Sequence, residues 1–139
     1  MDRFGDLMLE SKKMGETNDC VVKCLSVVTS VPYTQVHSVC RLFGRLDRCG
    51  MRMSQWTKAL RYLGYDLVDN TDYYRAIGGK TAKTVSAVLP KKPCIVRFSG
   101  HLAGWNGKEL VDWTKNRKHR VIGVYALKVH FVPGLDVRK

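Results

Sequence analysis

The hydrophobic pattern of this chain changes its period at the segment Pro90–Pro93, and this change limits the folds that are possible. Before the segment, apolar residues recur every three or four positions, which is the spacing of one helix face. After it come short runs of β-branched and aromatic residues separated by turn-forming residues, a pattern typical of strands joined by hairpins. Helices followed by an antiparallel sheet define an α+β fold, and the sequence therefore predicts an α+β domain.

The expected helices and strands lie between residues 20 and 132. Their ends follow from capping residues, from proline in a first turn and from glycine or proline after a last turn. Residues 1–14 show little pattern and are expected to form a lead-in strand or a mobile arm, whereas 45–52 and 70–80 are expected to be loops. The predicted helices run from Cys20 to about Ser30, from Pro32 to Gly44, over Gln55–Leu63 after Ser54 as N-cap, and from Thr81 to Pro90; the predicted strands cover Tyr65–Val68, Cys94–Phe98, His101–Trp105, Lys108–Trp113 and Val121–Leu127, with Lys128–Val132 as an extension.

Length and composition predict a single domain over residues 1–139. Hydrophobic residues make up 45% of the chain and charged residues 26%, which is the balance of a globular protein with a core. No apolar run approaches the roughly 20 residues of a membrane helix, and two acids among the first six residues argue against a signal peptide. We therefore expect a cytoplasmic protein without a membrane partner, in which the five cysteines are thiols.

A cysteine, Cys20, opens the first of these helices directly after the polar cluster Glu16–Asp19, which is expected to cap it. The first turn of a helix has unpaired backbone N–H groups and the positive end of the helix dipole, and both favour a thiolate over a thiol. A nucleophilic thiolate needs a base and a group that orients the base. The sequence offers His101 and Asp112 for these two roles.

His101 and Asp112 lie on the two arms of an expected hairpin. Asn106-Gly107 is a strong signal for a two-residue hairpin turn, and such a turn would place His101 directly opposite Asp112. Opposite residues on one face of an antiparallel pair have Cβ atoms about 4.5–5.5 Å apart, which suits a hydrogen bond between carboxylate and imidazole. The other ring nitrogen would face whatever packs on the sheet. If this is the start of the Cys20 helix, a thiolate–imidazolium pair forms.

These features together resemble the papain-like cysteine peptidases. The residues that carry the likeness are Asn18-Asp19-Cys20 at a helix start, and Gly100-His101 and Val111-Asp112-Trp113 around a hairpin. The likeness is to compact bacterial and phage members, such as the bacteriocin-processing peptidase domains, and it covers roughly residues 14–127. It implies a papain-like fold with N-terminal helices packed on a C-terminal antiparallel sheet, a phage or bacterial origin (with the host cytoplasm as location if phage-encoded), and a peptide or protein substrate.

The resemblance also implies roles for individual residues. Cys20 is implied as the nucleophile, His101 as the general base and acid, and Asp112 as the residue that orients the imidazole. An oxyanion hole is implied at the Cys20 N–H and an upstream side-chain amide, for which this chain offers Asn18. The activity so implied is that of a small cysteine hydrolase, a peptidase or isopeptidase, that works through a thioester and uses no cofactor or metal.

Two departures from the family pattern leave a non-enzymatic alternative open. Glu16 stands near the position where the family usually has a glutamine, and Val21 follows the cysteine where glycine is common. The formal net charge is +12, from 24 Lys and Arg against 12 Asp and Glu, and it favours acidic partners. The alternative is a catalytically degenerate papain-like fold that binds nucleic acid or an acidic host protein. Three tryptophans able to stack on bases and the basic run Lys115–Arg120 agree with such a role.

Spacing also permits a zinc site that would use Cys20. Cys20 and Cys24 are four residues apart, and His37 and Cys40 are three apart, which puts each pair on one helix face. Structural zinc sites more often take cysteines separated by two residues in a turn, and this sequence has no such pair. Cys24, Cys40 and Cys94 are therefore interpreted as buried core residues.

Overall fold

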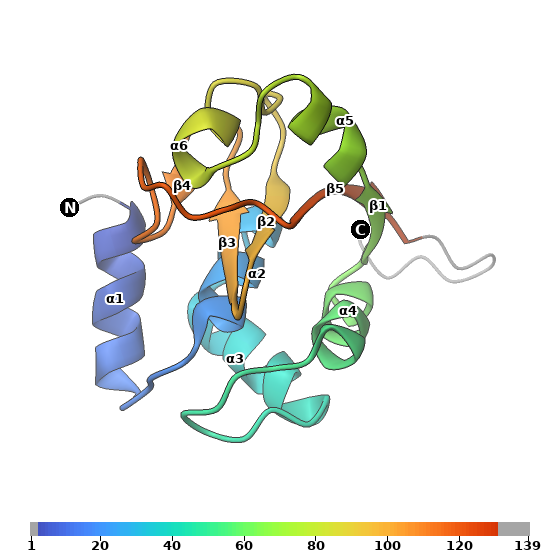
Figure 1. The fold of residues 1–139 in the computed structure, drawn as a ribbon. Coiled ribbons are helices and arrows are strands. Elements are labelled where there is room, and N and C mark those ends of the chain that lie inside the picture. The colour runs from blue at the N-terminus through green and yellow to red at the C-terminus, as the bar shows by residue number, and fades with distance from the viewer. Residues whose placement is uncertain (1–2, 131–139) are drawn as a thin grey trace.

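The computed structural model describes residues 3–130 and has an α+β fold (Figure 1). Its strands form one sheet in the order β1-β5-β2-β3-β4, and every neighbouring pair is antiparallel. The predicted combination of helices with an antiparallel sheet is confirmed. The elements are α1 (Arg3–Lys13), α2 (Cys20–Thr29), α3 (Tyr33–Leu42), α4 (Met53–Tyr62), β1 (Tyr65–Asp69), α5 (Thr71–Ala76), α6 (Ala82–Val85), β2 (Cys94–Phe98), β3 (His101–Trp105), β4 (Leu110–Val111) and β5 (Gly123–Val129).

Both faces of the sheet are covered, as the side chains of its central strand β2 show. Ile95 belongs to a core formed with α1, α2, α3 and α4. Cys94, Val96 and Phe98 point the other way, into a second core that includes α6. Successive side chains of a strand point to opposite faces, so a strand buried on both sides is apolar at consecutive positions. The apolar run that predicts β2 therefore reflects two cores.

Helix α2 packs directly on β3, and Gly104 permits this close approach. A Cβ atom at Gly104 would lie 2.8 Å from Cβ of Val27 and 3.1 Å from the carbonyl oxygen of Cys24, so a side chain there would push the helix away from the sheet. Glycine inside a strand often marks such a contact. The packing brings the first residue of α2, Cys20, close to the tip of the β2–β3 hairpin, where it lines one hollow together with Ser99, Gly100 and His101.

The turn between β3 and β4 is longer than the sequence predicts. The expected two-residue turn at Asn106-Gly107 is wrong, because the Asn106 side chain accepts hydrogen bonds from two backbone N–H groups and extends the turn over Asn106–Glu109. Trp105 therefore pairs with Leu110, and the register is shifted by two residues. A shift by two leaves each side chain on its predicted face, since the period of a strand is two.

Two segments predicted to be irregular are helical. Residues 1–14 are neither a strand nor a mobile arm, because Arg3–Lys13 form α1; residues 1 and 2 lie outside the described part. Leu7 is fully buried in α1, and Phe4, three residues earlier on the same face, packs against the same core. The predicted loop 70–80 contains the short helix α5, whose first residue, Thr71, donates its backbone N–H to the Asp69 carboxylate at 2.9 Å.

Several other predicted boundaries differ from the structure. Of the expected strand Lys108–Trp113, β4 keeps only Leu110–Val111, and β5 begins at Gly123 and not at Val121. Helix α4 begins two residues before the expected Gln55, and α6 is shorter than predicted, although Thr81 caps it as expected through a 3.2 Å hydrogen bond from the Thr84 N–H. Strand β5 continues into the expected extension as far as Val129, whereas residues 131 and 132 lie outside the described part. Within residues 3–130, none of the helices has the length and apolar character needed to cross a membrane.

Candidate active site

Cys20 is the first residue of α2 and lines an open cleft. Asp19 precedes it at the N-cap position, but the Asp19 side chain does not cap the helix, contrary to the prediction. Its carboxylate instead accepts a 2.6 Å hydrogen bond from the Tyr33 hydroxyl and lies 3.1 Å from Nζ of Lys23. Asp19 therefore leaves the first backbone N–H groups of α2 to other partners.

His101 lies beside both residues that the sequence assigns to it. Its Nε2 lies 2.7 Å from Oδ2 of Asp112, and it lines the same two surface hollows as Cys20. Burial alone would lower the pKa of His101, but its hydrogen bonds and charge interactions with Asp112 and Cys20 outweigh burial and raise this pKa to about 9. Because Asp112 takes Nε2, Nδ1 is the ring nitrogen left for the thiol. The three predicted residues are thus brought together.

The contact between His101 and Asp112 persists despite the shifted register, although Asp112 lies one residue beyond the end of β4. His101 is two positions before Ala103, and Asp112 is two positions after Leu110. Ala103 and Leu110 both belong to the core that includes α6. His101 begins β3 and Asp112 lies in the bend after β4, so the imidazole and the carboxylate meet diagonally and not as directly opposite neighbours.

Thr114 holds the carboxylate of Asp112 in place through two hydrogen bonds. The Thr114 hydroxyl and backbone N–H donate hydrogen bonds of 2.6 and 3.1 Å to Oδ2, the oxygen that also contacts His101. Asp112 is buried, and Thr114 is fully enclosed. Sequence reasoning assigns Thr114 no role, although a threonine two residues after an aspartate at a strand end is typical of a local turn of this kind.

Two aromatic rings pack against the imidazole of His101. The Phe98 ring is stacked on it with centroids 6.1 Å apart, and the Trp113 ring is tilted at 4.9 Å. Aromatic faces carry partial negative charge and favour a protonated neighbour. Trp113 is about half exposed at the cleft, whereas Trp105 is buried, so one hairpin tryptophan faces the cleft and the other packs in the core.

Cys20 and His101 lie where two hollows of the surface meet. The larger has a volume of about 730 Å³ and the smaller about 230 Å³, and both are lined by these two residues. A substrate chain placed across Cys20 would therefore find space on both sides of the sulfur. The larger hollow is also lined by Asn18, Trp113, His119 and Arg120, and the smaller by Met51, Met53, Trp56, Arg97 and Leu102.

Comparison with known proteins does not assign this chain to a family. No protein-family model, curated protein or solved structure matches the chain. The likeness to papain-like peptidases therefore stays a prediction from the short segments around Cys20, His101 and Asp112.

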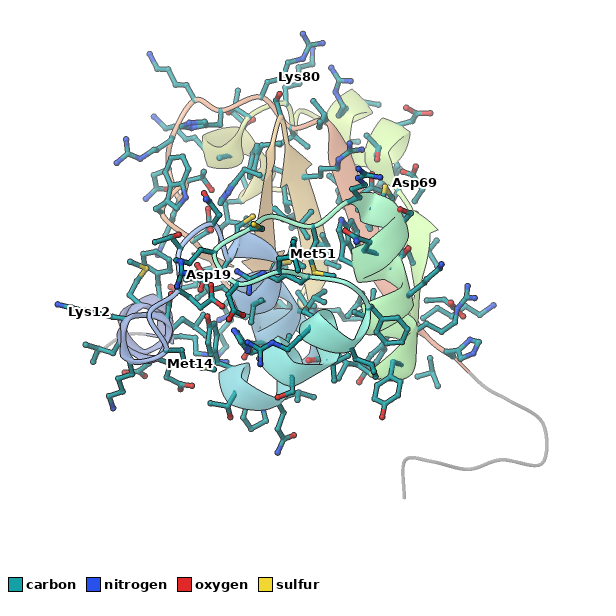
Figure 2. The ribbon with its side chains drawn as sticks, turned by 90° about the horizontal axis from the view of Figure 1, so that it is seen from below. Lys12, Met14, Asp19, Met51, Asp69 and Lys80 are labelled. Atoms are coloured by element: carbon teal, nitrogen blue, oxygen red, sulfur yellow. The ribbon has the colours of Figure 1, made fainter. Side chains whose placement is uncertain are left out.

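Asn18, the predicted oxyanion residue, lines the larger hollow. Its backbone is in the left-handed region with a φ of 52°, and its Nδ2 donates a 3.2 Å hydrogen bond to the carbonyl oxygen of Arg48. Arg48 belongs to the loop between α3 and α4. Figure 2 views the molecule from below, toward this loop with Met51, and shows Asp19 where the chain enters α2. The Asn18 amide has two N–H groups, and the bond to Arg48 uses one of them.

Glu16, near the usual position of the family's glutamine, is buried and bound to a different set of partners. Its carboxylate accepts hydrogen bonds of 2.9 and 3.0 Å from the Arg45 guanidinium and 2.8 Å from the Arg48 N–H, and it also contacts Nε2 of His37. The Arg45 hydrogen bonds are the main cause that holds the pKa of Glu16 well below its usual range, against the effect of burial. Sequence reasoning missed this cluster, which fixes the loop between α3 and α4 against the segment leading into α2.

The remaining cysteines differ from Cys20 in their surroundings. Cys24, Cys40 and Cys94 are buried, as predicted for core residues. Burial raises the pKa of Cys40 to about 12 and that of Cys94 to about 11, and it raises the pKa of Cys24 well above its usual value. Cys49 is exposed, whereas Cys20 is partly exposed at the cleft. Cys49 therefore serves as an internal reference for a thiol outside the site.

The cysteines and histidine whose spacing permits a zinc site do not gather into one cluster within residues 3–130. The potential metal ligands that lie within reach of one another there are Glu16, His37 and Asp47. Glu16 is already bound to Arg45, and Asp47 accepts a 2.6 Å hydrogen bond from Arg41. Two guanidinium groups thus compete with any cation for these carboxylates.

Proposed function

We propose that this protein is a papain-like cysteine hydrolase that cleaves peptide or isopeptide bonds. The observation that carries the proposal is the position of His101, which binds Asp112 and lies beside Cys20 in an open cleft. A nucleophile, a base and a carboxylate that orients the base are the parts that nucleophilic catalysis by cysteine requires. Charge interaction with Asp112 favours the imidazolium form, which is the partner a thiolate needs.

The first half of the reaction would transfer the acyl group to Cys20. The thiolate attacks the substrate carbonyl carbon, a C–S bond forms, and the carbonyl electron pair moves onto oxygen. When this intermediate collapses, the C–N bond breaks and the His101 imidazolium gives its proton to the leaving amine. A thioester on Cys20 and a neutral His101 remain.

The second half would release the acid. His101 takes a proton from a water molecule that attacks the thioester carbonyl, and the C–S bond then breaks. The products are the carboxylic acid, the Cys20 thiolate and the His101 imidazolium, so the starting state is restored. Asp112, held by Thr114, keeps the imidazole in one orientation through both halves.

Two donors are available for the negative oxygen that forms in each half. The Cys20 backbone N–H lies at the start of α2, and the Asn18 amide keeps one N–H beyond its bond to Arg48. Donors placed for a developing oxyanion contribute substantially, because removal of one typically lowers the rate by about 10²–10³-fold.

A mixture of synthetic peptides of varied sequence tests this function. The mixture is incubated with the wild-type protein, with Cys20→Ala and with Cys49→Ala, and new peptide termini are identified by mass spectrometry. We expect the same cleavages with wild type and with Cys49→Ala, and none with Cys20→Ala. Equal cleavage by Cys20→Ala would contradict the proposal.

A non-enzymatic binding role is the second candidate, and the basic side of the larger hollow favours it. Arg120 lines this hollow, and the Arg117 guanidinium lies 5.8 Å from the centre of the exposed Trp113 ring. A binding protein would keep its function in Cys20→Ala, whereas a hydrolase would lose it. A steep loss of binding with rising salt would identify nucleic acid as the partner.

A further inference from the structure

The smaller hollow beside Cys20 contains an arginine that has no acidic partner among residues 3–130. Arg97 is near the end of β2, on the same side as Ile95 and therefore toward the helices α2 and α4. The side-chain hydrogen bond described for it is a long contact of 4.0 Å with the sulfur of Met53. Within residues 3–130, no carboxylate lies within ion-pair distance of this guanidinium, although the residue is only partly exposed.

Apolar side chains form part of the wall around Arg97. Met51, Trp56 and Leu102 line the same hollow, and Trp56 and Leu102 also belong to the core beneath it. A side chain with an aliphatic stem and a charged end fits such a space, because the stem packs on the apolar walls while the end meets the guanidinium. Arg is suited to a carboxylate in particular, since its planar fork can donate two parallel hydrogen bonds.

The other charged residues of the cleft also favour an acidic ligand. The carboxylates that line it are Asp19 and Asp112, and both are already engaged, Asp19 by Tyr33 and Lys23 and Asp112 by His101 and Thr114. The arginines that line it, by contrast, have no carboxylate partner within the described residues. These arginines are Arg52 and Arg97 in the smaller hollow and Arg120 in the larger.

We propose that the hollow lined by Met51, Trp56 and Leu102 is a subsite for an Asp or Glu side chain of the substrate peptide, which binds Arg97. The assignment rests on the proposed hydrolase function and names the substrate class of that site, an acidic peptide. The subsite borders Cys20 and His101 directly, so the acidic residue of the substrate lies close to the bond that is cleaved.

Protection of Cys20 from alkylation tests this subsite without requiring a known substrate. The rate of iodoacetamide labelling at Cys20 is measured at pH 6 with increasing amounts of three hexapeptide pools, alike except for Glu, Gln or Lys at one central position. We expect half-protection by the Glu pool at about tenfold lower concentration than by the Gln pool, which is the effect of one charge-assisted hydrogen bond. The Lys pool should protect least.

Three variants test whether the preference for the Glu pool over the Gln pool depends on Arg97. Arg97→Gln should abolish the difference between the Glu and Gln pools, and Arg97→Lys, which keeps the charge, should retain part of it. Arg61→Gln removes the same charge at an exposed position, where Arg61 pairs with Asp66, and should leave the difference unchanged. Each rate is divided by the rate of the same variant without peptide, so that a general change in Cys20 reactivity cancels.

The outcomes separate the two proposals. Equal protection by the Glu and Gln pools, or a difference that persists in Arg97→Gln, would overturn the subsite while leaving the hydrolase proposal in place. Protection by a single-stranded oligonucleotide in the absence of protection by any peptide pool would overturn it in favour of nucleic acid. If Cys20 without peptide reacts no faster than Cys49, the hydrolase proposal fails, and the acidic-peptide assignment fails with it.

Discussion

Within residues 3–130, two histidine–carboxylate pairs with a buried carboxylate look alike but are placed to do different things. In each pair, Nε2 of the histidine contacts a carboxylate oxygen, His101 with Asp112 and His37 with Glu16. The carboxylate of each is almost completely enclosed. The difference lies in the third partner, which is the Cys20 thiol for the first pair and the Arg45 guanidinium for the second.

The third partner decides what each pair can do. Arg45 neutralises Glu16 and joins the loop between α3 and α4 to the segment before α2, so this cluster acts as a structural connection. Asp112 has no such cation and balances the charge of His101, whose pKa it helps to raise to about 9. A histidine–carboxylate bond alone is therefore no sign of catalysis; the accompanying nucleophile and the open cleft make the difference.

Among the variants that test this difference between the two pairs, Asp112→Asn is expected to have the largest effect. An asparagine cannot fix the imidazole in the required orientation and charge, and in the analogous triad of serine proteases this change lowers kcat by about 10⁴-fold. We expect a loss of similar order in the rate of Cys20-dependent peptide cleavage. The measurement is kcat on any peptide cleaved by wild type. A loss below about tenfold would show that Asp112 does not orient His101 as proposed.

Glu16→Gln should act on stability instead. It leaves the Arg45 guanidinium buried without its carboxylate, and breaking a buried ion pair in this way typically costs about 3–5 kcal/mol. Urea unfolding measures the loss. Asp66→Asn is the matched control, because Asp66 also binds a histidine and an arginine, but at the surface, where such pairs contribute about 0–1 kcal/mol. If the two variants lost the same free energy of unfolding, Glu16 would not be the structural link between the α3–α4 loop and the segment before α2.

The pH dependence of stability is a smaller effect that depends on His101. The folded-state pKa of about 9 lies above the ordinary value of 6.5, so the folded protein binds more protons than the unfolded chain between these two pH values. The stabilisation from His101 is fully present below pH 6.5 and is lost as pH rises through 9. The difference in Tm between wild type and His101→Gln should therefore shrink from pH 6 to pH 10. A difference that stays constant over this range would contradict the raised pKa.

The sequence predicts the catalytic candidates better than the surroundings that support them. Cys20, His101 and Asp112 follow from local signals, namely a helix start and a hairpin, and the error of two residues in the hairpin register is harmless because it preserves the face of each side chain. The assumed packing of Cys20 on the hairpin depends on Gly104, and a glycine inside an apolar strand is the signal that could have indicated it.

The structural cluster could not be predicted in the same way. Glu16 is separated in sequence by 21 residues from His37 and by 29 from Arg45, so no local pattern connects them. Arg45 sits in a polar, glycine-containing segment that indicates a solvated loop, although its side chain is almost completely buried. Helix α1 was missed because its apolar face is short, with the polar residue Ser11 one turn after Leu7, and its stability comes from packing on the core.

The most direct test of the central claim is alkylation by iodoacetamide at pH 6, read for each cysteine by peptide mass in wild type and in His101→Ala. If Cys20 and His101 form an activated pair, Cys20 is labelled much faster than the exposed Cys49, and this advantage disappears in His101→Ala while Cys49 is labelled as before. Equally slow labelling of Cys20 and Cys49 in the wild-type protein would contradict the claim, and it would leave the binding function as the better account of the cleft.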